Sequence, residues 1–447
     1  MNNKIIQLVG LVFFLLNVGC SDFLDEKSDT KLVVPETLRD NQALLDRIAN
    51  ILASNSISGQ ISSDEIYITD SDYNGISYEA DKRLYIWQPN LVARATGNDW
   101  GSCYFRINIC NTVLNNLEQY EINNAENVKG QALAIRASIY LEAAQIWCVA
   151  FNKDTANTDL GLPLRLNPDV NQKSVRATLE QTYNQILEDL HTAVSLLPEK
   201  QIAVTRASKA TALGLLARTY LYMGDYSNAL KYANEALGIN GQLLDFNTLT
   251  VTSSYPIKEM NIEVLLPTTI AYSPILSSNM AKIPPTLYQS YDNNDLRKTA
   301  FFRTNASGQI LFKGNYSGTS QRSSVLAKDE LYLIVAESYA QLNDINSAML
   351  KLNELLVKRW KAGTFIPFSA STKEEALQII KEERRKELLF RGLRWADIKR
   401  YNRDGDAITL TRTIGGEAYS LPPNDLRYAI AIPEDIIKQT GMPQNPR

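Results

Sequence analysis

The chain has 447 residues, of which 45% are hydrophobic and 21% charged, and its formal net charge is −3 at pH 7. This balance is typical of a globular protein and excludes the strongly basic surface of nucleic-acid-binding proteins. Four cysteines and one histidine leave little material for a zinc site or for histidine-based catalysis.

The N-terminus has the pattern of a signal peptide. Lys4 precedes an almost wholly apolar run that ends in Asn-Val-Gly before Cys20. A small residue before cysteine is similar to a lipobox, in which the cysteine is lipidated and becomes the mature N-terminus. We therefore expect a signal peptide at 1–19, a lipidated flexible tether at 20–34 and a single domain over 35–447. A plain secretory signal is the alternative.

The other cysteines indicate buried thiols. Cys103 and Cys110 are seven residues apart on an expected helix, which places their Cα atoms about 10.5 Å apart. That distance is too long for a disulfide. A bond from one of them to Cys148 stays open, and no cysteine spacing indicates a metal.

The first part of the domain alternates between helical and irregular segments. Residues 35–51 have the apolar spacing of a helix. Residues 56–97 are rich in Gly, Ser, Asp and Tyr without a helical period, which predicts a long irregular segment. Helix returns at Asn98, whose side chain can cap its first turn.

Two later segments repeat one spacing. Separations of 3, 9, 4 and 3 residues join Ala217, Tyr220, Ala229, Ala233 and Ala236, and again Ala336, Tyr339, Ala348, Leu352 and Leu355. Small residues at such positions let paired helices approach, as in tetratricopeptide (TPR) repeats. A third copy is split by 151–177, and the helices at 35–51 and after Asn98 would form a fourth pair. We predict a mainly all-α, TPR-like scaffold of about four helix pairs, over about 98–243 and 327–361, with little β structure. Coincidental helical hairpins are the alternative.

The repeats are interrupted by residues 238–326, which are rich in Pro, Ser, Tyr and Asn. Only 262–266 has the pattern of a strand. An insertion of this length within a compact chain is usually functional.

Seven charged residues in a row, 381–387, separate two apolar stretches with helical spacing. If one helix continues through them, Glu383, Arg384 and Glu387 share the buried face. Buried charges persist only when they are paired. We therefore expect a polar clamp, with Glu387 paired to Arg391 four residues later, and its members are Glu383, Arg384, Glu387, Arg394 and Asp397. A solvated charged turn is the alternative.

This stretch, E-R-R-K-E-L-x-F-x-G-x-R-W-x-D-x-K-R from Glu383 to Arg400, resembles the C-terminal signature (374–401 here) of the SusD/RagB family. Cys20-Ser-Asp-Phe-Leu-Asp, Asn294-Asp295-Leu296-Arg297 and Gln444-Asn445-Pro446 resemble further family patterns. The resemblance implies a lipid-anchored, surface-exposed outer-membrane protein that binds a glycan or another oligomeric nutrient. It also implies delivery of that ligand to a SusC-like TonB-dependent transporter, with no cofactor. The family commonly has an acidic residue where this chain has Arg391.

Aromatic and polar residues gather in the two irregular segments. Aromatic faces stack on sugar rings, and loops held by a rigid scaffold commonly carry function. We expect ligand contacts from Arg83, Tyr85, Trp87, Trp100, Tyr272, Tyr288 and Tyr291. The alternative for the two tryptophans is a place in the core.

Motifs for catalysis are missing from the sequence. His191 lies on an amphipathic helix, and no nucleophile motif, P-loop or Gly-rich dinucleotide motif accompanies it. We predict no enzyme, no catalytic residues and no metal. The acidic pairs Asp64-Glu65 and Asp292/Asp295 keep a surface glycoside hydrolase as an alternative. A TPR-type adaptor that binds peptide or protein is the other alternative.

Overall fold

Four helix pairs form the scaffold of the computed structural model, which describes residues 34–53, 55–90 and 98–447. Within these residues α3 packs on α8, α9 on α10, α11 on α12 and α15 on α16. The prediction of a mainly all-α, TPR-like fold is confirmed. The paired helices are α3 (Leu38–Leu45), α8 (Asp99–Gln119), α9 (Glu126–Trp147), α10 (Leu179–Leu196), α11 (Lys209–Met223), α12 (Tyr226–Ile239), α15 (Lys328–Gln341) and α16 (Ile345–Leu356).

The two pairs with matching spacing also share a turn. Gly224 ends α11 in the left-handed region (φ 79°), and the carboxylate of Asp225 then accepts a hydrogen bond from the Asn228 N–H, which caps α12. Asn343 (φ 66°) and Asp344 occupy the same places between α15 and α16. The small residues of both repeats are buried between the helices, so the spacing reports real helix pairing.

The expected helix at 35–51 is two helices, α3 and α4 (Ile48–Ile51), because the backbone of Arg47 (ψ 77°) leaves the helical region. Residues 55–90 are not irregular throughout, since they contain α5 (Ser58–Ser62), α6 (Asp70–Asn74) and α7 (Glu79–Tyr85). These helices are too short for a 3.6-residue period to be visible in the sequence.

The long insertion is built from short elements. Strand β3 (Val264–Leu266), inside the predicted strand, pairs with β6 (Leu326–Ala327), and β4 (Phe302–Thr304) pairs with β5 (Ile310–Phe312). Helices α13 (Pro285–Gln289) and α14 (Leu296–Phe301) lie between β3 and β4 in the sequence. The Phe312 ring stacks on Phe390 at 4.7 Å, which joins the insertion to the C-terminal part of the chain.

The C-terminal part contains α17 (Lys373–Glu387), α18 (Arg394–Arg403), the hairpin of β7 (Leu410–Ile414) and β8 (Glu417–Leu421), and α19 (Glu434–Thr440). The helix α17 continues through the charged residues 381–387, as expected, but it ends at Glu387 and does not reach the apolar residues that follow. Phe390 (φ 60°) and Gly392 (φ 74°) take left-handed conformations that no helix accommodates. The sequence pattern therefore continues across a turn, and α18 leaves in a new direction.

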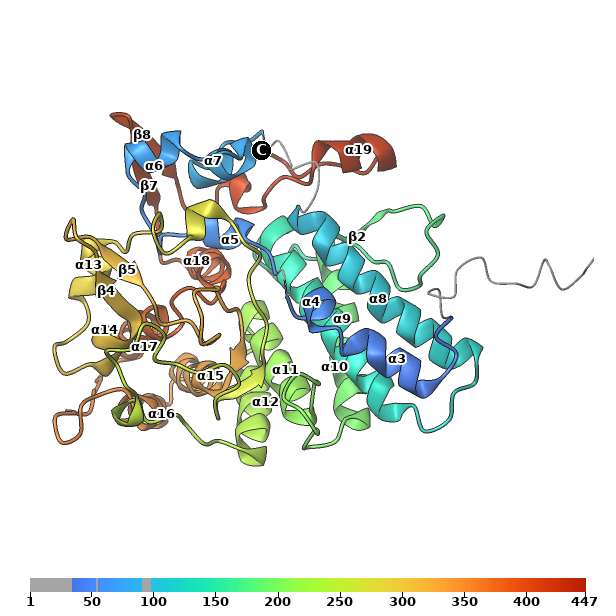
Figure 1. Cartoon of the computed structure of the whole chain (residues 1–447), viewed down its shortest axis with the longest axis horizontal. Coiled ribbons are helices and arrows are strands. Elements are labelled where there is room, and N and C mark those ends of the chain that lie inside the picture. The colour runs from blue at the N-terminus through green and yellow to red at the C-terminus, as the bar shows by residue number, and fades with distance from the viewer. Residues whose placement is uncertain (1–33, 54, 91–97) are drawn as a thin grey trace, which may run out of the picture.

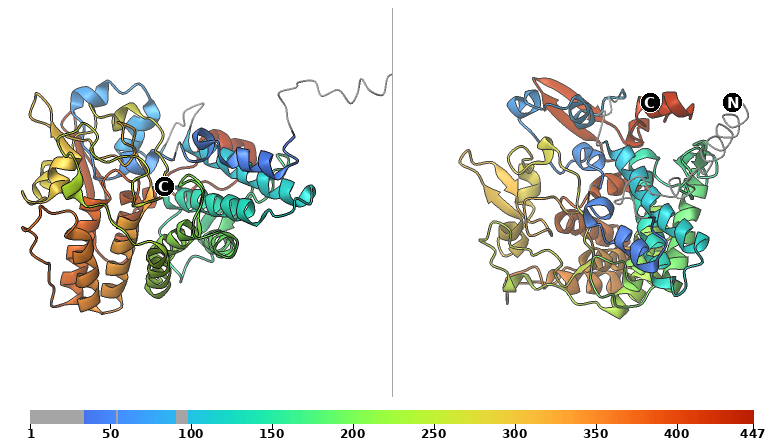
Figure 2. Two further views of the ribbon diagram at one scale, coloured as in Figure 1. Left: turned by 60° about the horizontal axis from the view of Figure 1, so that its bottom comes forward. Right: turned by 45° about the vertical axis from the view of Figure 1, so that its right-hand side comes forward.

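Figure 1 places the helices α8–α12 on one side and the insertion elements α13, α14, β4 and β5 on the other. Figure 2 shows from two further directions that the orange helices pack together, and α15 contacts both α16 and α17. The segment α5–α7 lies beside the β7–β8 hairpin, where the Gly415 N–H donates to Asp70. None of the described helices is long and apolar enough to cross a membrane.

The three cysteines of the described chain, Cys103, Cys110 and Cys148, are buried free thiols. The disulfide to Cys148 that the sequence left open is therefore not formed. Strands β1 (Leu160–Pro163) and β2 (Arg176–Thr178) form a small hairpin between α9 and α10. Cys20 and the predicted signal peptide lie outside the described residues.

Candidate functional site

The inward-facing acids of α17 are buried in ion pairs. Glu387 accepts from Arg297 at 3.0 Å and from Arg359 at 2.7 Å, and none of the three side chains is exposed. Glu383 accepts from the same Arg297 at 2.6 Å. Arg359 also donates to Glu263 at 2.8 Å. Two acids of α17 thus connect the segments that contain Arg297, Arg359 and Glu263, which lie far apart in the sequence.

Arg297 belongs to the Asn294–Arg297 motif, which the sequence analysis treated separately from the charged stretch. It also pairs with Asp295 at 2.7 Å, so three carboxylates surround one guanidinium. Burial alone would lower the pKa of Arg297, but these carboxylates raise it well above its ordinary value. The two motifs therefore meet in one buried charge cluster.

A second group of charges holds α17 against α18 and α15. Arg384 donates to Asp397 at 2.9 Å, and Asp397 accepts from Arg400 at the same distance. Arg400 in turn pairs with Glu337 of α15. Burial opposes ionisation of Asp397, but the two guanidiniums hold the pKa of its carboxyl below the usual value.

Arg391 does not pair with Glu387, which corrects the expected i,i+4 bond. The turn at Phe390 carries Arg391 away from α17, and its guanidinium bonds to Asp329 at 2.6 Å and lies 3.8 Å from the Tyr316 ring centroid. Arg394 bonds to Asp64 at 2.7 Å, so the same stretch also holds the N-terminal segment. Burial would raise the pKa of Asp64, but Arg394 outweighs it and keeps that pKa well below its usual range.

In each acidic pair proposed for a hydrolase, one carboxylate is engaged in the same way. Asp64 and Asp295 each bind a guanidinium. Burial raises the pKa of Glu65 to about 7, and its carboxyl accepts from Gln60 and from the Phe390 N–H in the interior. Among the described residues, no group of three or more His, Cys, Asp or Glu is placed to hold a metal ion.

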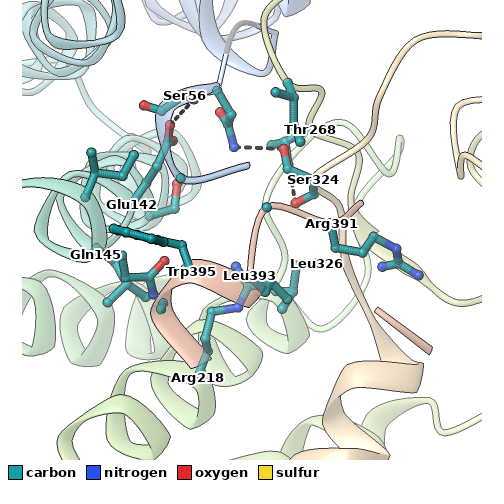
Figure 3. A pocket seen from close by; sticks show the side chains of 18 of the residues that line it. Ser56, Glu142, Gln145, Arg218, Thr268, Ser324, Leu326, Arg391, Leu393 and Trp395 are labelled. Atoms are coloured by element: carbon teal, nitrogen blue, oxygen red, sulfur yellow. Dashed lines mark hydrogen bonds between the residues drawn. The ribbon is translucent and has the colours of Figure 1, made fainter. Parts of the chain in front are cut away.

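A cavity of about 60 Å³ lies where α9, the segment at Ser56 and the turn before α18 meet. Figure 3 shows Glu142 and Gln145 of α9 on one wall, Thr268 and Ser324 on the other, and the Trp395 ring between them. A buried water molecule needs about 10–15 Å³ of such space. The cavity is therefore sized for a few water molecules, and an oligosaccharide does not fit.

Two buried donors in this cavity, Gln145 Nε2 and Trp395 Nε1, have no hydrogen-bond partner among the described residues. Buried donors are normally satisfied by protein or by ordered water. Since polar groups of Ser56, Glu142 and Ser324 line the same space, water molecules would complete these bonds.

Two of the predicted ligand residues lie in the core instead. Tyr85 and Trp87 are at most 5% exposed, and the guanidinium of Arg412 lies 3.7 Å from the Tyr85 ring centroid and 4.6 Å from that of Trp87. The Trp87 Nε1–H donates to the Ser62 carbonyl at 2.9 Å. The protein's own Arg412 thus covers the faces that were expected to stack on ligand.

Trp100 and Tyr291 are also core side chains. Trp100 packs between Tyr104 and Trp147, with ring centroids 4.8 and 5.0 Å away. The Tyr291 hydroxyl donates to the Lys386 carbonyl at 2.8 Å. Trp100 joins α8 to α9, and Tyr291 joins the insertion to α17, so both residues have a role in stability.

The remaining predicted residues are at the surface. Tyr272 is 77% exposed. Arg83 pairs with Glu79 on α7 at 2.8 Å, and Tyr288 is half-buried against Phe302. Of the predicted aromatic side chains, Tyr272 offers the most ring surface to a ligand.

The two segments chosen as ligand-binding lie side by side at Tyr272. The Asn55 N–H donates to Thr269, the Ala271 N–H donates back to Asn55, and Tyr67 pairs with Lys282. Arg106 Nη1 of α8 donates to the Asn55 side chain at 2.5 Å, and its neighbour Phe105 is 56% exposed. Phe105 was not predicted as a ligand residue. Because it lies outside the helical face formed by Cys103, Ile107 and Cys110, the sequence could have indicated an exposed side chain.

Comparisons with known proteins identify relatives of this chain. A family model described as "Starch-binding associating with outer membrane" matches residues 22–221, and one described as "SusD family" matches residues 326–443. SusD-like protein P2 of Formosa agariphila is 23% identical to this chain over an alignment of 519 residues. The alignment covers 98% of this chain and 99% of that protein.

Solved structures share the fold. A SusD superfamily protein from Bacteroides thetaiotaomicron superposes with a TM-score of 0.75 at 22% identity, covering 92% of this chain and 100% of that one. A SusD-like carbohydrate binding protein from Bacteroides vulgatus gives 0.69 at 20% identity, covering 90% and 97%. The resemblance thus extends over nearly the whole chain.

Proposed function

Because this chain belongs to the SusD/RagB family, we propose that it is a lipid-anchored protein of the outer membrane that binds an oligosaccharide at the cell surface. We further propose that it passes this ligand to a SusC-like TonB-dependent transporter. One matching family is described as starch-binding and one solved relative as a carbohydrate binding protein, and both support this ligand class. Lipidation at Cys20 would supply the anchor.

The observation that carries the binding proposal is the exposure of Tyr272 where the two irregular segments meet. A tyrosine that is 77% exposed leaves most of its ring in water, and such rings gain free energy when they stack on the apolar face of a sugar. Asn55, which pairs with the segment before Tyr272, also accepts a hydrogen bond from Arg106 of α8.

No catalytic residue is part of this proposal. One carboxylate of each acidic pair that could have formed a hydrolase site, Asp64 or Asp295, is already bound to an arginine of the same chain. Arg83 and Tyr288 remain candidates for contacts at the edge of the Tyr272 surface.

The binding proposal is tested by isothermal titration of the purified chain with starch-, β-glucan-, xylan- and pectin-derived oligosaccharides and with peptide mixtures. For a sugar that the wild type binds, Tyr272→Ala should weaken affinity at least tenfold, which is about 1.4 kcal/mol. Tyr255→Ala is the matched control, since Tyr255 is another exposed tyrosine of the same insertion, at 40%. Binding of peptides alone would favour the adaptor, and turnover of a glycan would favour the hydrolase.

A further inference from the structure

A larger recess lies away from Tyr272, between α8, the β1–β2 connection and α19. Its volume is about 310 Å³, which falls in the range of about 300–1,000 Å³ for small-molecule sites. We call it the α8–α19 groove, lined among others by Tyr104, Asn108, Arg165, Asn167 and Met442. Tyr272 does not line it. Phe105 does not line it either, but it lies one helical turn from the lining residues Gly101 and Asn108.

One face of α8 forms a wall of this groove. Gly101, Tyr104, Asn108 and Asn111 all line it, and their separations of 3, 4 and 3 residues place them in one helical stripe. Tyr104 is half-buried, and its hydroxyl donates to the Pro163 carbonyl at 2.9 Å, which fixes the ring. Trp100 packs behind it at 4.8 Å. The wall therefore presents a rigid aromatic side chain beside an amide.

That amide is available to a ligand. Asn111 is used internally, since it donates to the Arg165 carbonyl and accepts from Arg136. Asn108, one turn before it, is exposed, and its side chain makes no hydrogen bond to any residue that the structure describes. An amide side chain can both donate to and accept from sugar hydroxyls.

The groove has one charged residue among its described lining side chains, Arg165. Its guanidinium donates to the Gln172 carbonyl and the Ser174 hydroxyl and to the Asp169 carbonyl, but it pairs with no described carboxylate. Its Nε–H is buried without a partner in the described chain. The positive charge is therefore held in place by neutral groups and is not neutralised. Arginine in such a setting recognises carboxylate or sulfate groups.

We propose that the α8–α19 groove binds one acidic sugar unit, a uronate or a sulfated pyranose. The sugar ring would pack on Tyr104, its hydroxyls would bond to Asn108, and its acidic group would lie toward Arg165. This second site adds charge selectivity to the proposed function, and it depends on different residues from those at the Tyr272 surface.

The test uses the full chain carrying Tyr272→Ala, so that the groove alone reports. Titrations with trigalacturonate, a sulfated galactan tetrasaccharide and neutral cellotriose separate the two acidic sources from an uncharged sugar. We expect at least one acidic probe to bind more than tenfold tighter than cellotriose. Asn108→Ala should weaken that binding several-fold, and Arg165→Gln should remove the preference for the acid.

Asn115→Ala is the matched control, because Asn115 is an exposed asparagine further along the same helix that does not line the groove. Asn108 is itself exposed, so its variant should fold even if Arg165→Gln disturbs the loop. The inference is overturned if no acidic probe binds, if cellotriose binds equally well, or if Asn108→Ala leaves acidic binding unchanged. Tyr272→Ala removes binding of neutral glycans at the Tyr272 surface, whereas Asn108→Ala and Arg165→Gln change binding of acidic probes in the groove. Failure of one proposal is therefore distinguishable from failure of the other.

Discussion

Replacing Glu387 by alanine removes a carboxylate that two buried guanidiniums share. Glu387 lies 3.0 Å from Arg297 and 2.7 Å from Arg359, with all three side chains fully buried. Removal of one partner from a buried ion pair costs about 3–5 kcal/mol, because the remaining charge has lost its compensation. Arg297 keeps Asp295 and Glu383, and Arg359 keeps Glu263. We therefore expect the lower end of this range, about 3 kcal/mol.

Urea denaturation of the wild type and of Glu387→Ala measures this loss as a difference in the free energy of unfolding. Glu382→Ala is the matched control, since Glu382 is an exposed glutamate on the same helix, and it should change stability by no more than about 0.5 kcal/mol. If both variants lie within 0.5 kcal/mol of the wild type, the charged stretch is a solvated helix face and the reasoning from burial fails.

Three further predictions follow from other parts of the chain. Cys20→Ser should move the protein from the membrane fraction to the soluble fraction after a carbonate wash, because the lipid on Cys20 is the proposed anchor; retention would contradict lipidation. Trp87→Ala should lower stability by about 3–5 kcal/mol, since the ring is 5% exposed. An unchanged melting curve would show that the Trp87 ring is not part of the core. Burial raises the pKa of Glu65 from 4.5 to about 7, so the folded protein keeps a proton that the unfolded chain releases, and stability should fall as pH rises through this window. Glu65→Gln should flatten that fall in thermal melts between pH 4.5 and 7.5, and an equally steep fall in the variant would assign it to other groups.

The sequence was informative where local chemistry decides the structure. The alanine spacing in 210–243 and around 336–355 marks helix pairs because only small residues fit between closely packed helices. Gly224 and Asp225 predict their turn for the same local reason, since one tolerates a left-handed backbone and the other caps the next helix.

Partners that lie far away in the sequence could not be predicted. The charges of α17 were visible, but Arg297 and Arg359 reach them only through the fold. The faces of Tyr85 and Trp87 are covered by Arg412, more than 300 residues later. An aromatic residue in a loop has the same sequence signal whether it meets a ligand or an arginine of its own chain. The predicted ion pair between Glu387 and Arg391 does not form, because the left-handed turn at Phe390 is determined by tertiary packing and not by helical spacing.

The most direct measurement of ligand capture is a crystal structure of the chain with the oligosaccharide that binds it best in titration. We predict electron density for a sugar ring within about 4 Å of the Tyr272 ring, the distance of a packing contact, with the oligomer extending toward Asn55. Density for the oligosaccharide only at sites remote from Tyr272, at saturating ligand, would contradict the proposed binding surface.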